Sequence, residues 1–171
     1  GYLNIEVFGK TYYVGEFLGL SFVNDHSSVF LTYDVVLNNP SVKKYLEGDF
    51  KKKVFDYKAF INVLKRYGIN LYNVDFDLMI AAYLVNPNYG MGDFKQVYSN
   101  FSENTIAFYE TIYGANTKMM VPDLEVYAKY SVEKSIALQR IEKAVLTEIE
   151  KLNVQELFVI EMKLAKVLAE I

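Results

Sequence analysis

The stretch Tyr2-Leu3-Asn4-Ile5-Glu6-Val7-Phe8 decides the fold class. Its odd-numbered residues are apolar, whereas Asn4 and Glu6 are polar, which is the two-residue period of a β-strand. Residues i and i+2 of a strand point the same way, so Asn4 and Glu6 share one face of the sheet. A carboxylate there is costly unless a cation, a metal or solvent compensates its charge. The stretch therefore predicts a strand whose polar pair needs a partner.

Further strands and helices are expected on the C-terminal side of this strand. Alternation and turn residues predict strands at residues 20–23, 29–33 and 52–55, with a short strand or bend at 69–74. Helical spacing predicts helices at residues 41–46 after Pro40, 57–67 before Gly68, 78–84 capped by Asp75 or Asp77, 94–101, 122–152, and from 154 onward with Asn153 as cap. Residues 104–120 are the least regular. Strands followed by alternating strands and helices, and then by helices, indicate a layered α/β fold with a mixed sheet.

The amino-acid composition excludes several kinds of covalent and metal site. The chain has 171 residues, of which 52% are hydrophobic and 23% charged, as expected for one compact domain with a substantial core. It contains no cysteine and a single histidine, His26, which is expected at an exposed hairpin tip. Disulfides, thiolate metal sites and histidine-rich zinc sites are therefore excluded. Gly90-Met91-Gly92 is a lone G-x-G and is expected to be a loop, because the other features of a phosphate-binding loop are missing.

Charge and hydropathy bear on partners and location. The formal net charge is −3 and the sequence pI about 5.3. This lack of a basic excess weighs against tight, independent binding to DNA. The lysines at 51–53 are expected to form a solvated strand entry. The longest apolar run, residues 78–85, is too short to span a bilayer, so a cytoplasmic protein without a membrane partner is expected. Both ends suggest a piece cut from something longer.

The polar pair on the first strand has a chemical precedent. Two-metal nucleases place an Asp-x-Glu pair on a strand, because hard divalent cations need clustered carboxylate oxygens. Here the first member is Asn4, which keeps the shape of the aspartate but loses its charge.

Several longer segments carry a family resemblance. In order and spacing they resemble the 3′–5′ exonuclease (proofreading) domain of bacterial family A DNA polymerases, of the DNA polymerase I type. The segments are Gly19-Leu20-Ser21-Phe22, Val74-Asp75-Phe76-Asp77-Leu78-Met79-Ile80-Ala81-Ala82-Tyr83-Leu84, the stretch from Tyr113-Gly114 to Pro122, and the stretch from Glu161-Met162-Lys163-Leu164 to Leu168-Ala169-Glu170-Ile171.

The resemblance implies an RNase H-like (DnaQ-like) fold with a mixed central sheet flanked by helices. It implies an exonuclease-like domain at residues 1–152 and, at 153–171, a helix leading toward a polymerase domain. The implied partners are that C-terminal polymerase domain of the same chain and, through the parent enzyme, primer-template DNA, which the domain alone would bind weakly. A monomer is expected.

Active members of the family hold two divalent metals with four carboxylates and one tyrosine. The positions implied for them in this sequence are Asn4, Glu6, Phe60, Tyr130 and Lys134. Glu6 and Tyr130 match, whereas three carboxylate positions have become asparagine, phenylalanine and lysine. The resemblance therefore implies a vestigial site with no catalytic residue, no metal and no cofactor, and Mg²⁺ is expected only in the polymerase domain.

The ammonium group of Lys134 can supply positive charge in place of the metals. Tyr130 and Lys134 are i and i+4 on one helix face, so both can point at the first strand. We expect the Lys134 ammonium to serve as the counter-ion of Glu6. The alternative is that Lys134 reaches solvent and that Glu6 is exposed.

The sequence leaves three alternative functions open. The first is a catalytically inactive scaffold domain of a polymerase for DNA replication and repair. The second is a weakly active 3′–5′ exonuclease, in which Glu6 with Asp34 or Asp56 still binds Mn²⁺. The third is a protein-interaction domain, which an exposed apolar patch away from the old cleft would support.

Overall fold

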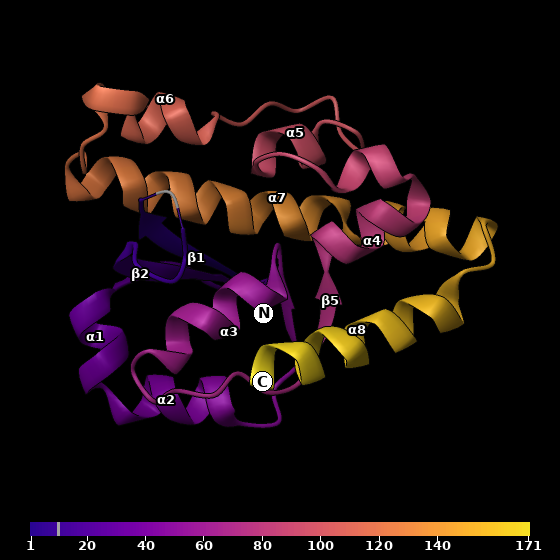
Figure 1. The fold of residues 1–171 in the computed structure, drawn as a ribbon, viewed down its shortest axis with the longest axis horizontal. Coiled ribbons are helices and arrows are strands. Elements are labelled where there is room, and N and C mark those ends of the chain that lie inside the picture. The colour runs from indigo at the N-terminus through magenta and orange to yellow at the C-terminus, as the bar shows by residue number, and fades with distance from the viewer. Residues whose placement is uncertain (10) are drawn as a thin grey trace.

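A five-stranded mixed sheet in the order β3-β2-β1-β4-β5 forms the centre of the structure, a computed structural model that describes residues 1–9 and 11–171 (Figure 1). The central strand β1 pairs antiparallel with β2 and parallel with β4, while β2 pairs antiparallel with β3 and β4 pairs parallel with β5. The strands are β1 (Tyr2–Phe8), β2 (Glu16–Val23), β3 (Ser28–Thr32), β4 (Lys52–Val54) and β5 (Val74–Asp77). The predicted α/β class with a mixed sheet is confirmed.

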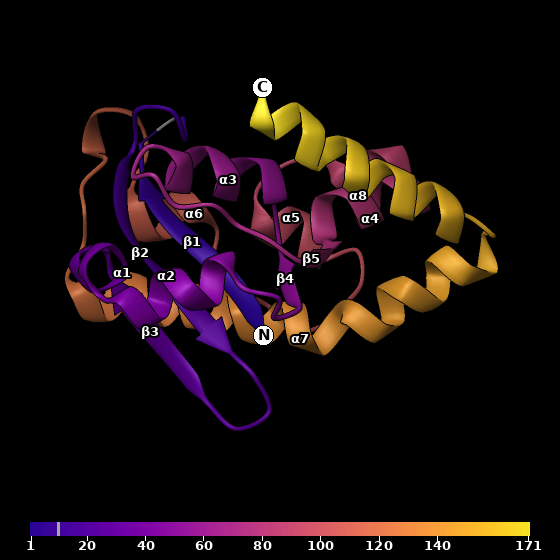
Figure 2. The same cartoon turned by 90° about the horizontal axis from the view of Figure 1, so that it is seen from below.

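Helices cover both faces of this sheet. The long helix α7 crosses β1, β2 and β3 on one side, whereas α3 and α8 lie on the other side (Figure 2). The α-helices are α1 (Tyr33–Asn38), α2 (Pro40–Glu47), α3 (Tyr57–Lys65), α4 (Leu78–Val85), α5 (Phe94–Tyr98), α6 (Tyr109–Tyr113), α7 (Leu124–Lys151) and α8 (Gln155–Glu170), with 3₁₀ turns η1 (Pro87–Gly90) and η2 (Asn116–Lys118). None of them, within the described ranges, is long and apolar enough to cross a membrane.

Polar caps set the start of several helices. Asp56, Asp77 and Asp93 accept backbone N–H bonds at the N-termini of α3, α4 and α5. At α5, Gln96 completes a capping box with Asp93. Of the two caps predicted for α4, Asp77 is therefore the one used. Asp56 and Asp77 lie at the carboxyl ends of β4 and β5, so their caps fix where the chain leaves the sheet.

Some predicted boundaries are wrong. Strand β2 begins at Glu16 rather than at residue 20, because Gly19 lies within the strand at φ +151° beside an irregularity in the β1–β2 register. A Cβ added at Gly19 would collide with the Leu31 carbonyl oxygen, so the glycine marks a close backbone approach rather than a turn. Strand β5 is Val74–Asp77, later than the bend predicted at 69–74.

Other differences concern helices. The short helices α1 and α6 were not predicted; α6 has five residues, which is too few for a periodic pattern to stand out. Asn153 does not cap α8: it adopts a left-handed conformation with φ 56°, and Val154 takes the N-cap position without a side-chain bond. Asparagine tolerates this conformation, so Asn153 instead turns the chain between α7 and α8.

Of the three lysines predicted to form a solvated strand entry, Lys51 is exposed, but the two that lie in β4 are not solvated. Lys52 is fully buried, and its ammonium donates to the carbonyl oxygens of Gly48, Phe50 and Tyr72 at 2.7–3.0 Å. Lys53 bridges Asp75 and Glu142 at 2.9 and 2.7 Å. Both cations are therefore structural, since each compensates acceptors that the fold brings together.

Asp77 joins two helices and is expected to make stability depend on pH. Its oxygens accept the backbone N–H groups of Tyr57 and Ile80 at 2.7 and 3.0 Å, and the side chain is buried. Burial, and then the charge of Asp56, raise the pKa of Asp77 to about 7. The folded protein therefore holds this proton to a higher pH than the unfolded chain does, and the free energy of unfolding falls as pH rises through the window from the unfolded pKa, about 4, to about 7.

The Asp77→Asn variant isolates this effect, because its amide does not titrate. We expect the unfolding free energy of the wild type, minus that of the variant, to fall between pH 4 and pH 8 by on the order of 4 kcal/mol at most. Urea unfolding of both proteins at a series of pH values measures the difference. A difference that stays flat, or that rises with pH, would contradict the assignment.

Candidate functional site

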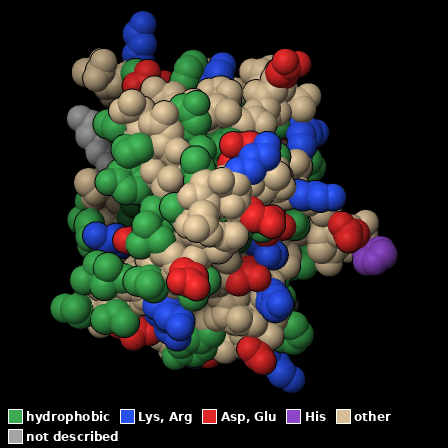
Figure 3. Space-filling view, turned by 90° about the vertical axis from the view of Figure 1, so that its right-hand side faces the viewer, with side chains coloured by type: hydrophobic (Ala, Val, Ile, Leu, Met, Phe, Trp, Pro, Cys, Tyr) green, Lys and Arg blue, Asp and Glu red, His purple; other side chains and the backbone are tan. Residues whose placement is uncertain are grey.

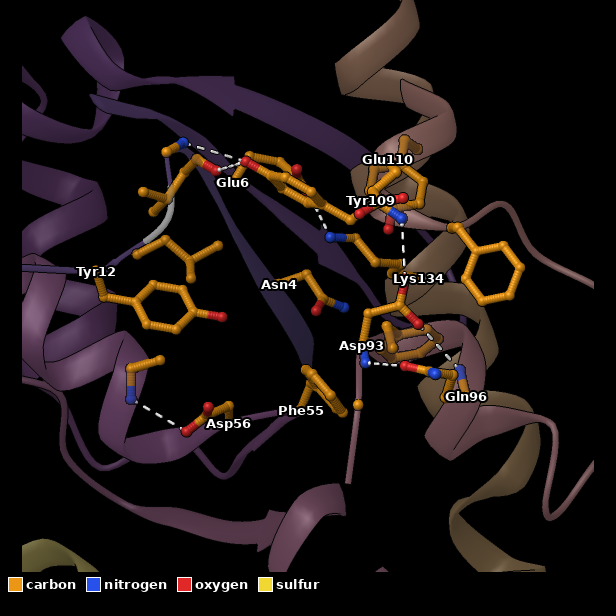
Figure 4. A pocket seen from close by; sticks show the side chains of 18 of the residues that line it. Asn4, Glu6, Tyr12, Phe55, Asp56, Asp93, Gln96, Tyr109, Glu110 and Lys134 are labelled. Atoms are coloured by element: carbon orange, nitrogen blue, oxygen red, sulfur yellow. Dashed lines mark hydrogen bonds and ion pairs between the residues drawn. The ribbon is translucent and has the colours of Figure 1, made fainter. Parts of the chain in front are cut away.

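A cavity of about 840 Å³ opens beside β1, between α3, α6 and α7 (Figure 4). Its lining contains all five positions implied by the family resemblance: Asn4, Glu6, Phe60, Tyr130 and Lys134. Asn4 and Glu6 come from β1, Phe60 from α3, and Tyr130 and Lys134 from α7. Residues up to 130 positions apart in the sequence are therefore gathered around one space.

Glu6 is the central residue of this site, and it is 1% exposed. Its Oε1 lies 2.5 Å from the Lys134 ammonium, without the geometry of a hydrogen bond. Its Oε2 accepts a hydrogen bond of 2.5 Å from the Tyr113 hydroxyl. The expected ion pair between Glu6 and Lys134 is confirmed, and the alternative of an exposed Glu6 and a solvated Lys134 is wrong. Both carboxylate oxygens face a partner supplied by the protein.

Lys134 is held in place from a second side. Its ammonium lies 4.1 Å from the centroid of the Tyr130 ring, a cation–π contact, and its side chain is 9% exposed. Tyr130 and Lys134 are one turn apart on α7, as their spacing predicted. The aromatic face and the carboxylate together compensate for the loss of hydration of the ammonium.

Two buried tyrosines complete the surroundings of Glu6. Burial, and then the negative charge of Glu6, raise the pKa of both Tyr113 and Tyr130. The Tyr113 hydroxyl therefore remains protonated at neutral pH and can donate to the carboxylate. Its ring packs edge-on to Tyr130 and stacks on Tyr109, with centroids 6.4 and 4.5 Å apart.

Asn4 belongs to a group of buried polar side chains that hydrogen-bond α7 to the sheet. Its Nδ2 donates to the Ser135 hydroxyl at 3.3 Å. The Ser21 hydroxyl on β2 donates to the Ser131 carbonyl at 2.8 Å and lies 2.7 Å from the Ser135 hydroxyl. All four side chains are buried. The amide of Asn4 thus makes a neutral hydrogen bond to α7 on the same face of β1 as Glu6.

Phe60 occupies its position as a core residue. It is 1% exposed on α3 and belongs to the main hydrophobic cluster. Its ring supplies no oxygen or nitrogen to the cavity that it lines, so it can hold neither a metal nor a water molecule there.

The two other carboxylates considered as ligands lie in different places. Asp56 lines the cavity, but its Oδ1 accepts the Ala59 N–H at the start of α3, and burial raises its pKa. Asp34 is an exposed residue of α1 that does not line the cavity; its carboxylate accepts a hydrogen bond from Thr32, which lowers its pKa. The idea that either residue joins Glu6 in holding Mn²⁺ gains no support from these positions.

The residues present do not fit a two-metal centre. Two Mg²⁺ ions require clustered oxygen ligands, whereas Glu6 is already paired and its neighbours are an amide, a phenyl ring and an ammonium. Among residues 1–9 and 11–171, no three histidine, cysteine, aspartate or glutamate side chains form a group that could hold a metal ion.

Other lining residues were not predicted from the sequence. Tyr12, Asp93, Gln96, Tyr109 and Glu110 also border the cavity, and Tyr113 reaches Glu6 beside it. Only Asp93 and Gln96 had a recognisable signal, because Asp-x-x-Gln before an apolar residue is a capping box. The roles of Tyr109 and Tyr113 depend on α6, which lies in the segment without a clear pattern.

Comparison with known sequences gives a consistent family. The family described as "DNA polymerase I, ribonuclease H-like domain" matches residues 3–141. DNA polymerase I of Bacillus subtilis is 32% identical over 168 residues, and that of Bacillus caldotenax is 33% identical over 171 residues. These alignments cover 97% and 98% of this chain but 19% of each relative, so the chain spans about a fifth of their length.

Solved structures show the same fold at low sequence identity. NrnC of Brucella melitensis aligns with a TM-score of 0.79 at 13% identity, over 99% of this chain and 82% of its own. Escherichia coli RNase D, described as an exoribonuclease, aligns with a TM-score of 0.75 at 15% identity, over 99% and 44%. The POL domain of Pol1 from M. smegmatis aligns with a TM-score of 0.75 at 17% identity, over 99% and 28%. Together with the family match over residues 3–141, this likeness makes the fold RNase H-like.

Proposed function

Because the chain belongs to the DNA polymerase I, ribonuclease H-like domain family, we propose that it is an exonuclease-like domain that no longer cuts DNA and that serves as a scaffold for the polymerase portion of its parent enzyme. One observation carries the proposal. The single glutamate left at the vestigial site has one oxygen against the Lys134 ammonium and the other bonded to the Tyr113 hydroxyl.

Electrostatics argue against metal binding beside this pair. Two unit positive charges about 4 Å apart repel by roughly 4 kcal/mol at an effective dielectric of 20, and a divalent cation doubles the figure. Such a cation would also have to displace the Lys134 ammonium from Glu6 while Asn4 and Phe60 offer no negative oxygen. Without a metal there is no activated water and no clamp on a scissile phosphate.

The charges around the cavity argue against independent binding of DNA by this domain. Among its described lining residues, Glu6, Asp56, Asp93 and Glu110 are acidic and Lys134 is basic. An acidic cavity opposes the approach of a phosphate backbone, as does the net charge of −3. We therefore assign contact with primer-template DNA to the parent enzyme and a supporting role to this domain.

Digestion of a single-stranded oligonucleotide labelled at its 5′ end tests the proposal. With Mg²⁺ or Mn²⁺, the oligonucleotide is expected to stay intact with the wild type and with Glu6→Ala, while an active 3′–5′ exonuclease degrades it under the same conditions. Stepwise shortening that Glu6→Ala abolishes would contradict the proposal and favour the weakly active exonuclease. Shortening that persists unchanged in Glu6→Ala would reveal a contaminating nuclease, to be removed by further purification before the comparison is repeated.

A further inference from the structure

The cavity beside β1 has the size and the walls of a site for a small organic molecule. Its volume of about 840 Å³ lies within the roughly 300–1,000 Å³ that is typical of such sites. Aromatic rings form much of its wall, among them Tyr12, Phe55, Phe60, Phe94 and Phe108. The rings of Phe55 and Phe94 meet edge to face, with their centroids 5.0 Å apart. The cavity therefore offers flat apolar surfaces against which an aromatic ring can pack.

A buried amide oxygen in this wall can still accept a hydrogen bond. The side chain of Asn4 is 4% exposed, and its Nδ2 donates to the Ser135 hydroxyl. Its Oδ1 has no hydrogen-bond partner within residues 1–9 and 11–171. Figure 4 shows Asn4 and the Tyr12 hydroxyl directed into the same part of the cavity. Because buried polar atoms are normally hydrogen-bonded, this oxygen suits a ligand that carries an N–H donor.

Asp56 supplies a negative charge in the same part of the cavity. Its Oδ1 accepts the Ala59 N–H, and a carboxylate has room for further donors. Burial, and then the charge of Asp56, raise the pKa of the Tyr12 hydroxyl, so these two groups face a common space. Glu6 has the Lys134 ammonium as its cation, but Asp56 belongs to none of the ion pairs among the described residues. A positively charged ligand would compensate this carboxylate.

The electrostatic character of the cavity favours a cation over an anion. Its described lining residues carry four carboxylates and one ammonium, whereas acidic and basic side chains are interspersed on the outer face drawn in Figure 3. Two rings of the wall already have an ammonium over their faces: Lys134 lies 4.1 Å from the centroid of Tyr130, and Lys95 lies 4.3 Å from that of Phe108. Aromatic faces and carboxylates both attract cations, so an anionic ligand is disfavoured.

We propose that this cavity binds a small planar organic cation of the aromatic amidine or aromatic amine class. Its ring packs among the phenyl groups of Phe55 and Phe94, and its N–H groups donate to the Asp56 carboxylate and to Asn4 Oδ1. An amidinium suits the carboxylate because it presents two parallel N–H donors. Such a ligand differs in charge from a nucleic acid and in its demands from a metal ion, which needs clustered oxygens. The inference goes beyond the scaffold function and does not depend on it.

NMR titration of the 171-residue domain with three probes that share a benzene ring tests the proposal. Benzamidine is the cation, benzamide the neutral analogue and benzoate the anion. We expect benzamidine to bind saturably with a Kd of about 1 mM or tighter, benzamide to bind at least about tenfold more weakly, and benzoate not to bind. The amide shifts should change most at Asn4, Phe55 and Asp56. No saturable binding of benzamidine, equal binding of benzoate, or shift changes centred elsewhere would overturn the proposal.

A matched pair of variants tests the role of the carboxylate. Asp56→Asn keeps a side chain that caps α3, because asparagine is also a good N-cap. We expect it to weaken benzamidine binding by about tenfold or more and to change benzamide binding less than about twofold. Asp34→Asn removes an exposed carboxylate that does not line the cavity, and should leave both affinities unchanged. Equal benzamidine affinity in Asp56→Asn and the wild type would overturn the proposal. None of these measurements depends on nuclease activity, so a failure of the scaffold proposal in the digestion assay is seen separately.

Discussion

Replacing Lys134 with methionine is expected to lower the free energy of unfolding by about 3–5 kcal/mol, because the substitution leaves the Glu6 carboxylate buried without its cation. Methionine retains most of the apolar stem, so the loss reports mainly on the charge. Urea unfolding of the 171-residue domain at neutral pH measures it.

Two variants make this result specific. Lys129→Met removes an exposed lysine of the same helix, whose ammonium lies 3.8 Å from Glu133, and is expected to cost less than about 1 kcal/mol. Adding Glu6→Gln to Lys134→Met is expected to recover most of the lost stability, since no charge then remains buried. If Lys134→Met costs no more than Lys129→Met, the Glu6–Lys134 pair does not hold the site together.

Truncating Phe60 to alanine is expected to lower the free energy of unfolding by about 3–5 kcal/mol. The ring is 1% exposed within the main core cluster, so its removal loses buried apolar area and leaves a void. The conservative Phe60→Leu change is expected to cost less than about 2 kcal/mol, because leucine refills most of the volume.

The same pair of variants tests what Phe60 does at the candidate site. If Phe60→Ala costs less than about 1 kcal/mol, the ring is not part of the core, and its position is available to a polar ligand. The large loss that we expect would mean that packing now depends on a position that the family resemblance assigns to a carboxylate.

Much of the fold could be predicted because local signals agreed with the tertiary structure. The alternation of residues 2–8 gave β1 its bounds, and Pro40 and Asp77 marked helix starts that the structure uses. The errors occurred where tertiary contacts override local pattern. Gly19 resembles a turn residue, yet it lies within β2 because the backbone of β3 approaches it too closely for a side chain.

The site could be predicted only in part, for a related reason. The family resemblance named five positions, and the structure places them around one cavity. That these positions are remnants of a metal site stays a prediction. The spacing of Tyr130 and Lys134 could place both on one helix face, but it could not reveal that the Tyr113 hydroxyl donates to the second oxygen of Glu6. That contact depends on how the five-residue helix α6 packs, which no periodic pattern encodes.

The burial of Lys52 could not be predicted from the sequence for the same reason. A run of three lysines favours solvent, yet the Lys52 ammonium is buried among carbonyl oxygens of Gly48, Phe50 and Tyr72. Those acceptors come from two segments about 20 residues apart, so only the folded chain brings them together.

Calorimetric titration of the 171-residue domain with Mn²⁺ tests the central claim most directly, which is that Lys134 has replaced the metals as the partner of Glu6. The account predicts no saturable binding heat at millimolar Mn²⁺ and traces that superimpose for the wild type and Glu6→Ala. Saturable binding that Glu6→Ala abolishes would contradict it, because the carboxylate would then be available to a metal ion despite the adjacent ammonium.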